Sequence, residues 1–268
     1  MRSPIFNREV PGYNGTPIAM HRALAHRPFR MANAAAGALT VAAALLLYAA
    51  AYPLLLAAWA WALEQGVQAL GLAVKVRHWP VAWSTDSQWG IDRLVLAGPM
   101  PAVSRLALLV LAMVCIAGWV LLKRLRDAWT PVAYALRVLM ALGLASCVYF
   151  WCWPEHFPYR LADHTRDIYA FNVGLQWLVP LVLGLTLFPI VSGPVHRILA
   201  CLTVQGYFVL TLPIKVIAHA WLALHLGAVA LPLLFLAFGP VLDVMLMVAL
   251  YAWIATWFTA PDADQDPA

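Results

Sequence analysis

Charged residues are scarce in this chain of 268 residues. Only 11% of its residues are Asp, Glu, Lys or Arg, whereas 64% are hydrophobic; a soluble domain has roughly 25% and 45–50% of the same classes. The composition therefore excludes a water-soluble fold and predicts an integral membrane protein. The length leaves room for several spans of about 20 residues each, with modest loops and no large extramembrane domain.

Signatures of the common enzyme classes are also missing. The sequence contains no GxxxxGK[ST] or GxGxxG nucleotide loop, no HExxH zinc-protease motif and no GxSxG motif of a serine hydrolase. Its four cysteines lie in apolar stretches without CxxC or Cys/His spacing, which is typical of small buried side chains. We therefore expect no metal and no cofactor. The basic residues form short blocks beside apolar runs, so nucleic-acid binding is not indicated either.

Long runs without charge mark the membrane spans. No charged residue lies between Arg30 and Glu64, a run too long for the core of a cleavable signal peptide, so it predicts a first helix that stays in the membrane. The sequence predicts an all-α polytopic membrane protein with about six transmembrane helices, although three short helices in the last stretch would fit as well as two long, kinked ones. The later spans are expected at 106–122, 138–153 and 168–191, with two more in 198–258.

The remaining segments are predicted to lie outside the membrane. Residues 1–30 are a basic tail and residues 261–268 an acidic tail, and a single transmembrane domain spans 31–260. The proposed inner segments hold ten basic residues and the outer segments hold seven, and the N-terminal tail usually dominates orientation. We therefore expect a bacterial inner-membrane protein with a cytoplasmic N terminus.

The longest outside loop, 64–105, carries the only strand pattern. Residues 74–77 alternate apolar with basic side chains, and residues 91–96 are mostly β-prone. The turn-forming residues 84–87 lie between them, which predicts a small β-hairpin on the membrane surface.

A cluster of polar residues at 154–167 is the first candidate site. It contains His156, Arg160 and His164, and Cys152 precedes it at the end of the third predicted span. A thiol activated by a histidine, with an arginine beside an anionic intermediate, is what a cysteine transpeptidase requires. The alternative is a solvated loop whose charges pair weakly with each other and with lipid headgroups.

Two charges inside the apolar C-terminal region form the second candidate. Lys215 and Asp243 are the only charged residues in 198–258, and His219 follows Lys215 by one helical turn. Ionisable groups at membrane depth are costly unless they are paired or hydrated, so they are functional candidates by default. The pair could be a structural clamp or part of an ion or proton path, and Lys215 could instead reach the membrane interface.

Haem ligation by His219 and His225 is the third candidate, because both histidines lie in an apolar setting. Two histidines must bind opposite sides of one porphyrin, whereas a separation of six on one helix turns them partly away from each other. The spacing therefore argues against haem.

One segment carries a family resemblance. Residues 169–175 read Tyr-Ala-Phe-Asn-Val-Gly-Leu and lead into a Leu-rich span, after a first helix and an outside loop with short β-like segments. This arrangement resembles the small membrane proteins associated with exosortases, the bacterial protein-sorting transpeptidases. None of the four cysteines has the Cys-Ser-Gly signature of the exosortases themselves, so the resemblance implies an accessory role beside an envelope enzyme.

Three functions are compatible with the sequence. The first is a multi-pass accessory or scaffold subunit of a cell-envelope system for protein sorting, secretion or polymer export, in contact with lipids and another membrane protein. The second is a membrane-embedded enzyme with an outer-interface site of Cys152, His156, Arg160 and His164. The third is a small transporter that uses Lys215 and Asp243, with His219 beside them. The accessory subunit is the leading interpretation because no motif requires either chemistry.

Overall fold

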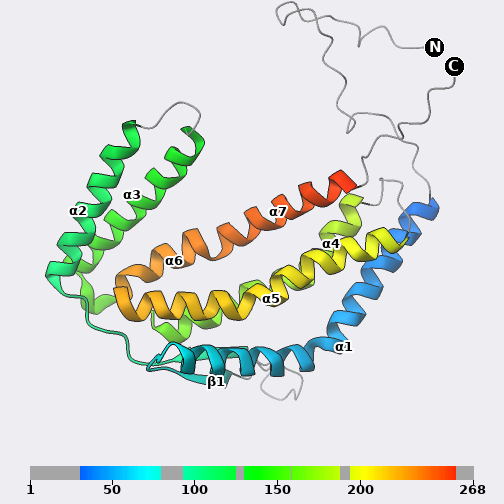
Figure 1. The fold of residues 1–268 in the computed structure, drawn as a ribbon, viewed down its shortest axis with the longest axis horizontal. Helices are drawn as coiled ribbons and strands as arrows, with labels where there is room; N and C mark the ends of the chain where they lie inside the picture. The colour runs from blue at the N-terminus through cyan, green and yellow to red at the C-terminus, as the bar shows by residue number, and fades with distance from the viewer. Residues whose placement is uncertain (1–30, 80–92, 125–129, 158, 188–193, 258–268) are drawn as a thin grey trace, which may run out of the picture.

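The computed structural model describes residues 31–79, 93–124, 130–157, 159–187 and 194–257 (Figure 1). Six helical segments in these ranges are long and apolar enough to cross a membrane, and one two-stranded antiparallel sheet accompanies them. The predicted fold class is therefore confirmed. The elements are α1 (Met31–Ala69), β1 (Lys75–Trp79), β2 (Arg93–Ala97), α2 (Arg105–Leu121), α3 (Thr130–Cys152), α4 (Leu161–Leu187), α5 (Pro194–Leu226), α6 (Leu231–Phe238) and α7 (Pro240–Trp257).

Helix α4 lies at the centre of the bundle. It packs against α1, α5 and α7, and half of its most apolar window is buried, a larger share than in any other span. The start of α1, the end of α4 and the end of α7 lie toward one end of the bundle, and the hairpin lies at the other (Figure 1). We call the second end the hairpin side. Helices α2 and α3 pack on each other and reach the remaining bundle through α3, which contacts α6 and the turn Ala228–Ala230.

The last span is broken in its interior. Helices α6 and α7 together form one span, Ala228–Thr256, and Gly239 separates them with non-helical angles (φ −93°, ψ −118°). Pro240 follows and has no N–H group to continue the hydrogen bonding of α6. A Cβ atom on Gly239 would lie 2.4 Å from the carbonyl oxygen of Phe235, so a larger residue would not fit this break. The C-terminal region therefore holds two spans, α5 and the broken α6–α7, as predicted.

Two helices begin earlier than the sequence pattern predicted. The third span starts at Thr130 rather than 138, and Arg137 inside it donates a hydrogen bond from its Nη2 atom to the carbonyl of Leu122 (3.1 Å). The fourth starts at Leu161 rather than 168, where Asp163 accepts a hydrogen bond from the backbone N–H of Arg160 (3.2 Å). The prediction that 154–167 is entirely an outside loop was therefore wrong, since its second half is the first two turns of α4.

The β-hairpin is docked on the helical bundle. Its strands pair from Lys75 opposite Ala97 to Trp79 opposite Arg93, close to the predicted segments 74–77 and 91–96. The predicted turn at 84–87 lies outside the described residues. Leu94, Val95 and Leu96 of β2 are buried, and the backbone N–H of Leu96 donates to the Oγ1 atom of Thr165 in α4 (3.1 Å). Helix α1 also continues to Ala69, so the connection between α1 and α2 is shorter than the outside loop predicted at 64–105.

Three apolar clusters lie in the described residues: two fill the bundle of α1, α4, α5 and α7 at different depths, and the third lies between α2, α3 and the turn Ala228–Ala230. The cluster near the hairpin joins Trp59 and Leu63 of α1 to Leu94 of β2 and to residues from α4, α5 and α6. The second cluster of the bundle joins Val179 and Leu183 of the second half of α4 to residues of α1, α5 and α7. The polar side chains described below lie at the junction of these two clusters, where α4, α5 and α7 meet.

Candidate functional site

The two intramembrane charges form a buried ion pair. Lys215 lies in α5 two residues after Pro213, and Asp243 lies in the first turn of α7, four residues after Gly239. The Nζ atom of Lys215 contacts the Oδ1 atom of Asp243, and the two side chains keep only 12% and 4% of their surface exposed. Lys215 therefore points to Asp243 and not to the membrane interface. The pair links α5 to the helix break between α6 and α7.

A continuous row of polar side chains extends from this pair into the bundle. Asn172 donates to the second carboxylate oxygen of Asp243 (3.5 Å), and Gln176 donates to the Oδ1 atom of Asn172 (3.0 Å). The hydroxyl group of Tyr48 in α1 donates to the Oε1 atom of Gln176 (2.6 Å). We call Lys215, Asp243, Asn172, Gln176 and Tyr48 the polar row. It connects four spans through side chains that are mostly buried.

The sequence of α4 explains why the polar row forms there. His164, Asn172 and Gln176 are separated by eight and four residues, so they lie on one face of the helix. That face is turned into the bundle, because all three residues are fully buried. Gln205 of α5 holds the far end by donating to the backbone carbonyl of Gln176 (3.1 Å). The buried amides thus have partners, as buried polar groups require.

Two buried histidines lie one helical turn beyond the ion pair. The Nε2 atom of His164 and the Nδ1 atom of His219 are 3.0 Å apart, and the rings stack with an interplanar angle of 23°. Within the described part of the chain, the Nδ1 atom of His164 is buried without a hydrogen-bond partner. Such an unpaired buried atom costs about 1–3 kcal/mol. The sequence predicts His164 in the outer-loop site and His219 in the ion path, whereas the structure brings the two rings together.

A charged cluster lies around the start of α4. The hydroxyl group of Tyr159 donates to the Oδ2 atom of Asp167 (3.0 Å), and Arg166 forms ion pairs with Asp167 (3.0 Å) and Asp163 (3.4 Å). Burial, together with the hydrogen bond to Asp167, raises the pKa of Tyr159 above its usual range. The Tyr159 ring also contacts the edge of the His164 ring (5.9 Å between centroids). The cluster therefore lies between the histidine pair and the hairpin side.

The proposed outer-interface enzyme site is not assembled in the described residues. Cys152 is a free and exposed thiol, and His156 and Arg160 are exposed as well. No hydrogen bond joins Cys152 to His156, Arg160 or His164 over the ranges that the structure describes. His164 is turned into the bundle, toward His219. A Cys–His dyad is therefore absent from this part of the molecule.

The histidines considered for haem are also separated. His225 is exposed at the end of α5, where its ring contacts the backbone carbonyl of Trp221 (2.7 Å), whereas His219 is buried against His164. In the described portion of the chain, no group of three or more His, Cys, Asp or Glu side chains could hold a metal ion.

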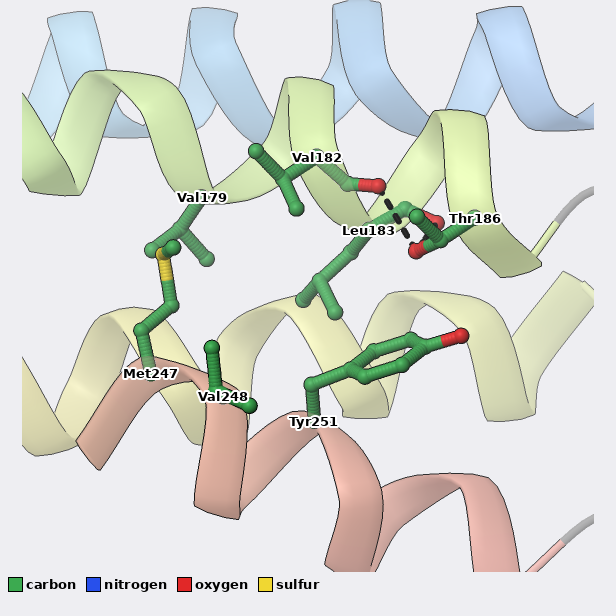
Figure 2. Close-up of a pocket in the computed structure, with 7 residues that line it drawn as sticks. All are labelled: Val179, Val182, Leu183, Thr186, Met247, Val248 and Tyr251. Carbon is green, nitrogen blue, oxygen red and sulfur yellow. Dashed lines mark hydrogen bonds between the residues drawn. The ribbon is translucent and has the colours of Figure 1, made fainter. Parts of the chain in front are cut away.

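A small hollow of about 70 Å³ lies between α4 and α7, in the half of the bundle away from the hairpin (Figure 2). The Oγ1 atom of Thr186 donates to the carbonyl of Val182 in its own helix (2.7 Å), so this hydroxyl is already satisfied. The hollow carries no charged side chain and offers little to a polar ligand. Its lining residues are Val179, Val182, Leu183, Thr186, Met247, Val248 and Tyr251.

A comparison of the chain with protein-family models, curated proteins and solved structures finds no match. The resemblance to exosortase-associated proteins therefore stays a prediction. The fold itself defines the class: this is a multi-pass helical membrane protein with a buried ion pair at a helix break.

Sequence reasoning missed much of the polar row. The sequence did not predict Tyr48, Gln176 or the neighbouring Gln205 as site residues, and Asn172 entered only through the resemblance segment. A signal was present, because Asn172 and Gln176 are amides four residues apart in an otherwise apolar span, a spacing that puts them on one helix face.

Proposed function

We propose that this protein is a small multi-pass transporter in which the Lys215–Asp243 pair takes up and releases a proton. The observation that carries the proposal is the position of the pair, which joins α5 to the break of the α6–α7 span. Transport proteins commonly place binding groups beside such discontinuous helices, near the middle of the membrane. A charged residue costs about 2.5–3.5 kcal/mol at the centre of a span, so retained charges there favour a functional role.

Protonation of Asp243 would change the contacts at the break. The neutral carboxyl group loses most of its attraction for Lys215, and α7 is then held less tightly to α5. Gly239 and Pro240 interrupt the helix at that point, so α7 can change its angle to α6 without breaking a continuous helix. The proposed cycle alternates between a paired state and a protonated, loosened state.

The donor set around Asp243 favours a proton over a metal cation. Its carboxylate is contacted by the ammonium group of Lys215 and the amide of Asn172, and neither side chain adds a negative charge. A metal cation would have to displace Lys215, whereas a proton needs only to neutralise the carboxylate.

An accessory subunit is the second candidate function. Helix α2 buries only Leu108 and Cys115 along its described length, so most of its apolar surface faces outward, toward lipid or a partner helix. A partner protein in a cell-envelope complex would use such a face. For either function, we propose that the protein resides in a bacterial inner membrane, with its N terminus in the cytoplasm and the hairpin side outside.

Purification followed by reconstitution tests the proposal. The tagged protein is extracted in mild detergent, its co-purifying proteins are identified by mass spectrometry, and the pure chain is placed in liposomes that hold a pH-sensitive dye. We expect an imposed pH gradient to decay faster than in protein-free liposomes, in proportion to the amount of protein. A chain that leaves the gradient intact and copurifies with a stoichiometric envelope protein would overturn the transporter in favour of the accessory subunit.

A further inference from the structure

We infer that His164 and His219 form the entry to the proton path, and that the Nδ1 atom of His164 is the site that accepts a proton from the hairpin side. This inference rests on the proposed function for the destination of the proton, which is the polar row. The inference goes beyond the proposed function by assigning the side from which the proton enters, the atom that receives it and the order of the transfers. The geometry that carries it is the buried contact between the two rings and the unpartnered atom of His164.

The inference assigns one tautomer to each ring. The Nδ1 atom of His219 lies 3.0 Å from the Nε2 atom of His164, and one of these two nitrogens must donate and the other accept. The His219 ring also interacts with the backbone of Phe238, the last residue of α6. We assign the hydrogen of His219 to Nε2, which leaves its Nδ1 atom as the acceptor and the Nε2 atom of His164 as the donor. In this assignment the unpartnered Nδ1 atom of His164 carries no hydrogen and can accept a proton.

Charged and titratable groups approach His164 from the hairpin side and from α5. On its own helix, Asp167 lies one turn further along, and Tyr159 of the preceding loop contacts the ring edge. On α5, His219 contacts the His164 ring, and Lys215 lies one helical turn before His219 in the sequence. From α6 the ring contact is Phe235, which is apolar.

Asp167 can supply the proton because its carboxyl group lies partly at the surface of the protein. About a third of its side chain is exposed (35%), whereas His164 is completely buried. Its charge also acts directly on the His164 ring. A proton relay needs an acidic group at the surface followed by a buried imidazole, and Asp167 and His164 lie in that order.

The transfer involves two proton movements. A proton from the hairpin side bonds to Nδ1 of His164, and the proton on Nε2 of His164 moves to Nδ1 of His219. His164 is again neutral, with its hydrogen now on Nδ1, and His219 carries both ring protons and one positive charge. That charge lies one turn from Lys215, so the two cations repel each other and Lys215 is held less tightly by Asp243.

Nitrogen NMR of the full chain in lipid bilayers tests the inference without measuring transport. The protein is labelled with ¹⁵N-histidine, and the signals are assigned with the variants His164→Gln and His219→Gln. In the wild-type protein we expect a nitrogen–nitrogen coupling across the hydrogen bond between the rings, and an unprotonated Nδ1 on His164. A wild-type His164 that carries its hydrogen on Nδ1 would overturn the inference, even if neither variant folds.

Exchange of the His219 ring proton into D₂O tests the route. In His164→Gln the amide still donates to His219, but it has no second nitrogen to receive a proton. A positioned proton-transfer group contributes about 10²–10⁴-fold, so we expect exchange at His219 to slow by at least about tenfold. His225→Gln is the matched control, because His225 is exposed at the end of the same helix, where it contacts the backbone carbonyl and the ring of Trp221 and not His219.

The outcomes separate this inference from the proposed function. Unchanged exchange at His219 in His164→Gln would overturn the relay, even if proton flux in liposomes depends on Asp243. Slowed exchange, together with the assigned tautomers in the wild-type protein, would support the two histidines as a proton entry. If the wild-type protein then showed no proton flux in liposomes, only the proposed transport function would be refuted.

Discussion

Replacing Asp243 with asparagine is expected to abolish proton flux while the protein still inserts into the membrane, with a lower stability because Lys215 loses its counter-charge. Asparagine has nearly the same shape, and its carbonyl oxygen can accept the hydrogen bond of Lys215, but its NH₂ group cannot accept the bond from Asn172 and its amide does not ionise. Because general acid–base groups contribute about 10²–10⁴-fold, we expect flux to fall by about 10²-fold or more. The measurement is decay of an imposed pH gradient in liposomes that contain equal amounts of each protein.

Glu155→Gln is the control for the Asp243 variant. Glu155 is exposed in the short turn Pro154–His156, outside the spans, and its replacement removes one acidic group without touching the polar row. We expect this variant to keep the flux of the wild-type protein. If Asp243→Asn transports as fast as the control, the Lys215–Asp243 pair does not carry the proton.

Replacing Lys215 with methionine is expected to destabilise the fold strongly. The change keeps a long apolar stem but leaves Asp243 buried with only the amide of Asn172 as a partner. Breaking one side of a buried ion pair costs about 3–5 kcal/mol, because the remaining charge is uncompensated. Reversible unfolding in mixed detergent micelles measures the free energy of unfolding, and Lys75→Met on the exposed hairpin edge serves as the matched control.

The double variant Lys215→Met with Asp243→Leu separates stability from function. Replacing both members of a buried pair with apolar side chains is often neutral or stabilising. We therefore expect the double variant to recover most of the lost stability and to have no flux. A double variant that is as unstable as Lys215→Met alone would show that the polar row depends on the carboxylate of Asp243 for its structure.

The spans could be predicted because charge and apolar length decide them. The uncharged run between Arg30 and Glu64 lies within α1, and the apolar region 198–258 holds α5 from its second turn onward and the α6–α7 span, with the break at Gly239. The start of α4 was missed because Asp163, Arg166 and Asp167 read as loop residues. Only the folded structure shows that these side chains lie on the outward face of a helix whose other face is buried.

The candidate site was only partly predictable for a related reason. Lys215 and Asp243 could be identified because they are the only charged residues in the apolar sequence 198–258. The pairing of His164 with His219 depends on the packing of α4 against α5, across 55 residues of chain, and no local pattern reports it. Tyr48 was missed for the same reason, since its partner Gln176 is 128 residues away.

The polar row could hold the helices rigidly or respond to protons, and these two roles differ in one observable. A structural clamp keeps Asp243 ionised and bonded to Lys215 at all times. A proton carrier must spend part of its time as a neutral carboxyl group, with its hydrogen bonds to Lys215 and Asn172 rearranged.

Infrared difference spectroscopy of the protein in bilayers distinguishes the two roles most directly. Spectra are recorded while the pH is lowered across the physiological range, and those of Asp243→Asn are subtracted to isolate one carboxyl group. The account predicts that a protonated-carboxyl band of Asp243 appears as the pH falls and is missing from the variant. An Asp243 that stays ionised throughout would contradict the account and show that the ion pair is a fixed structural contact.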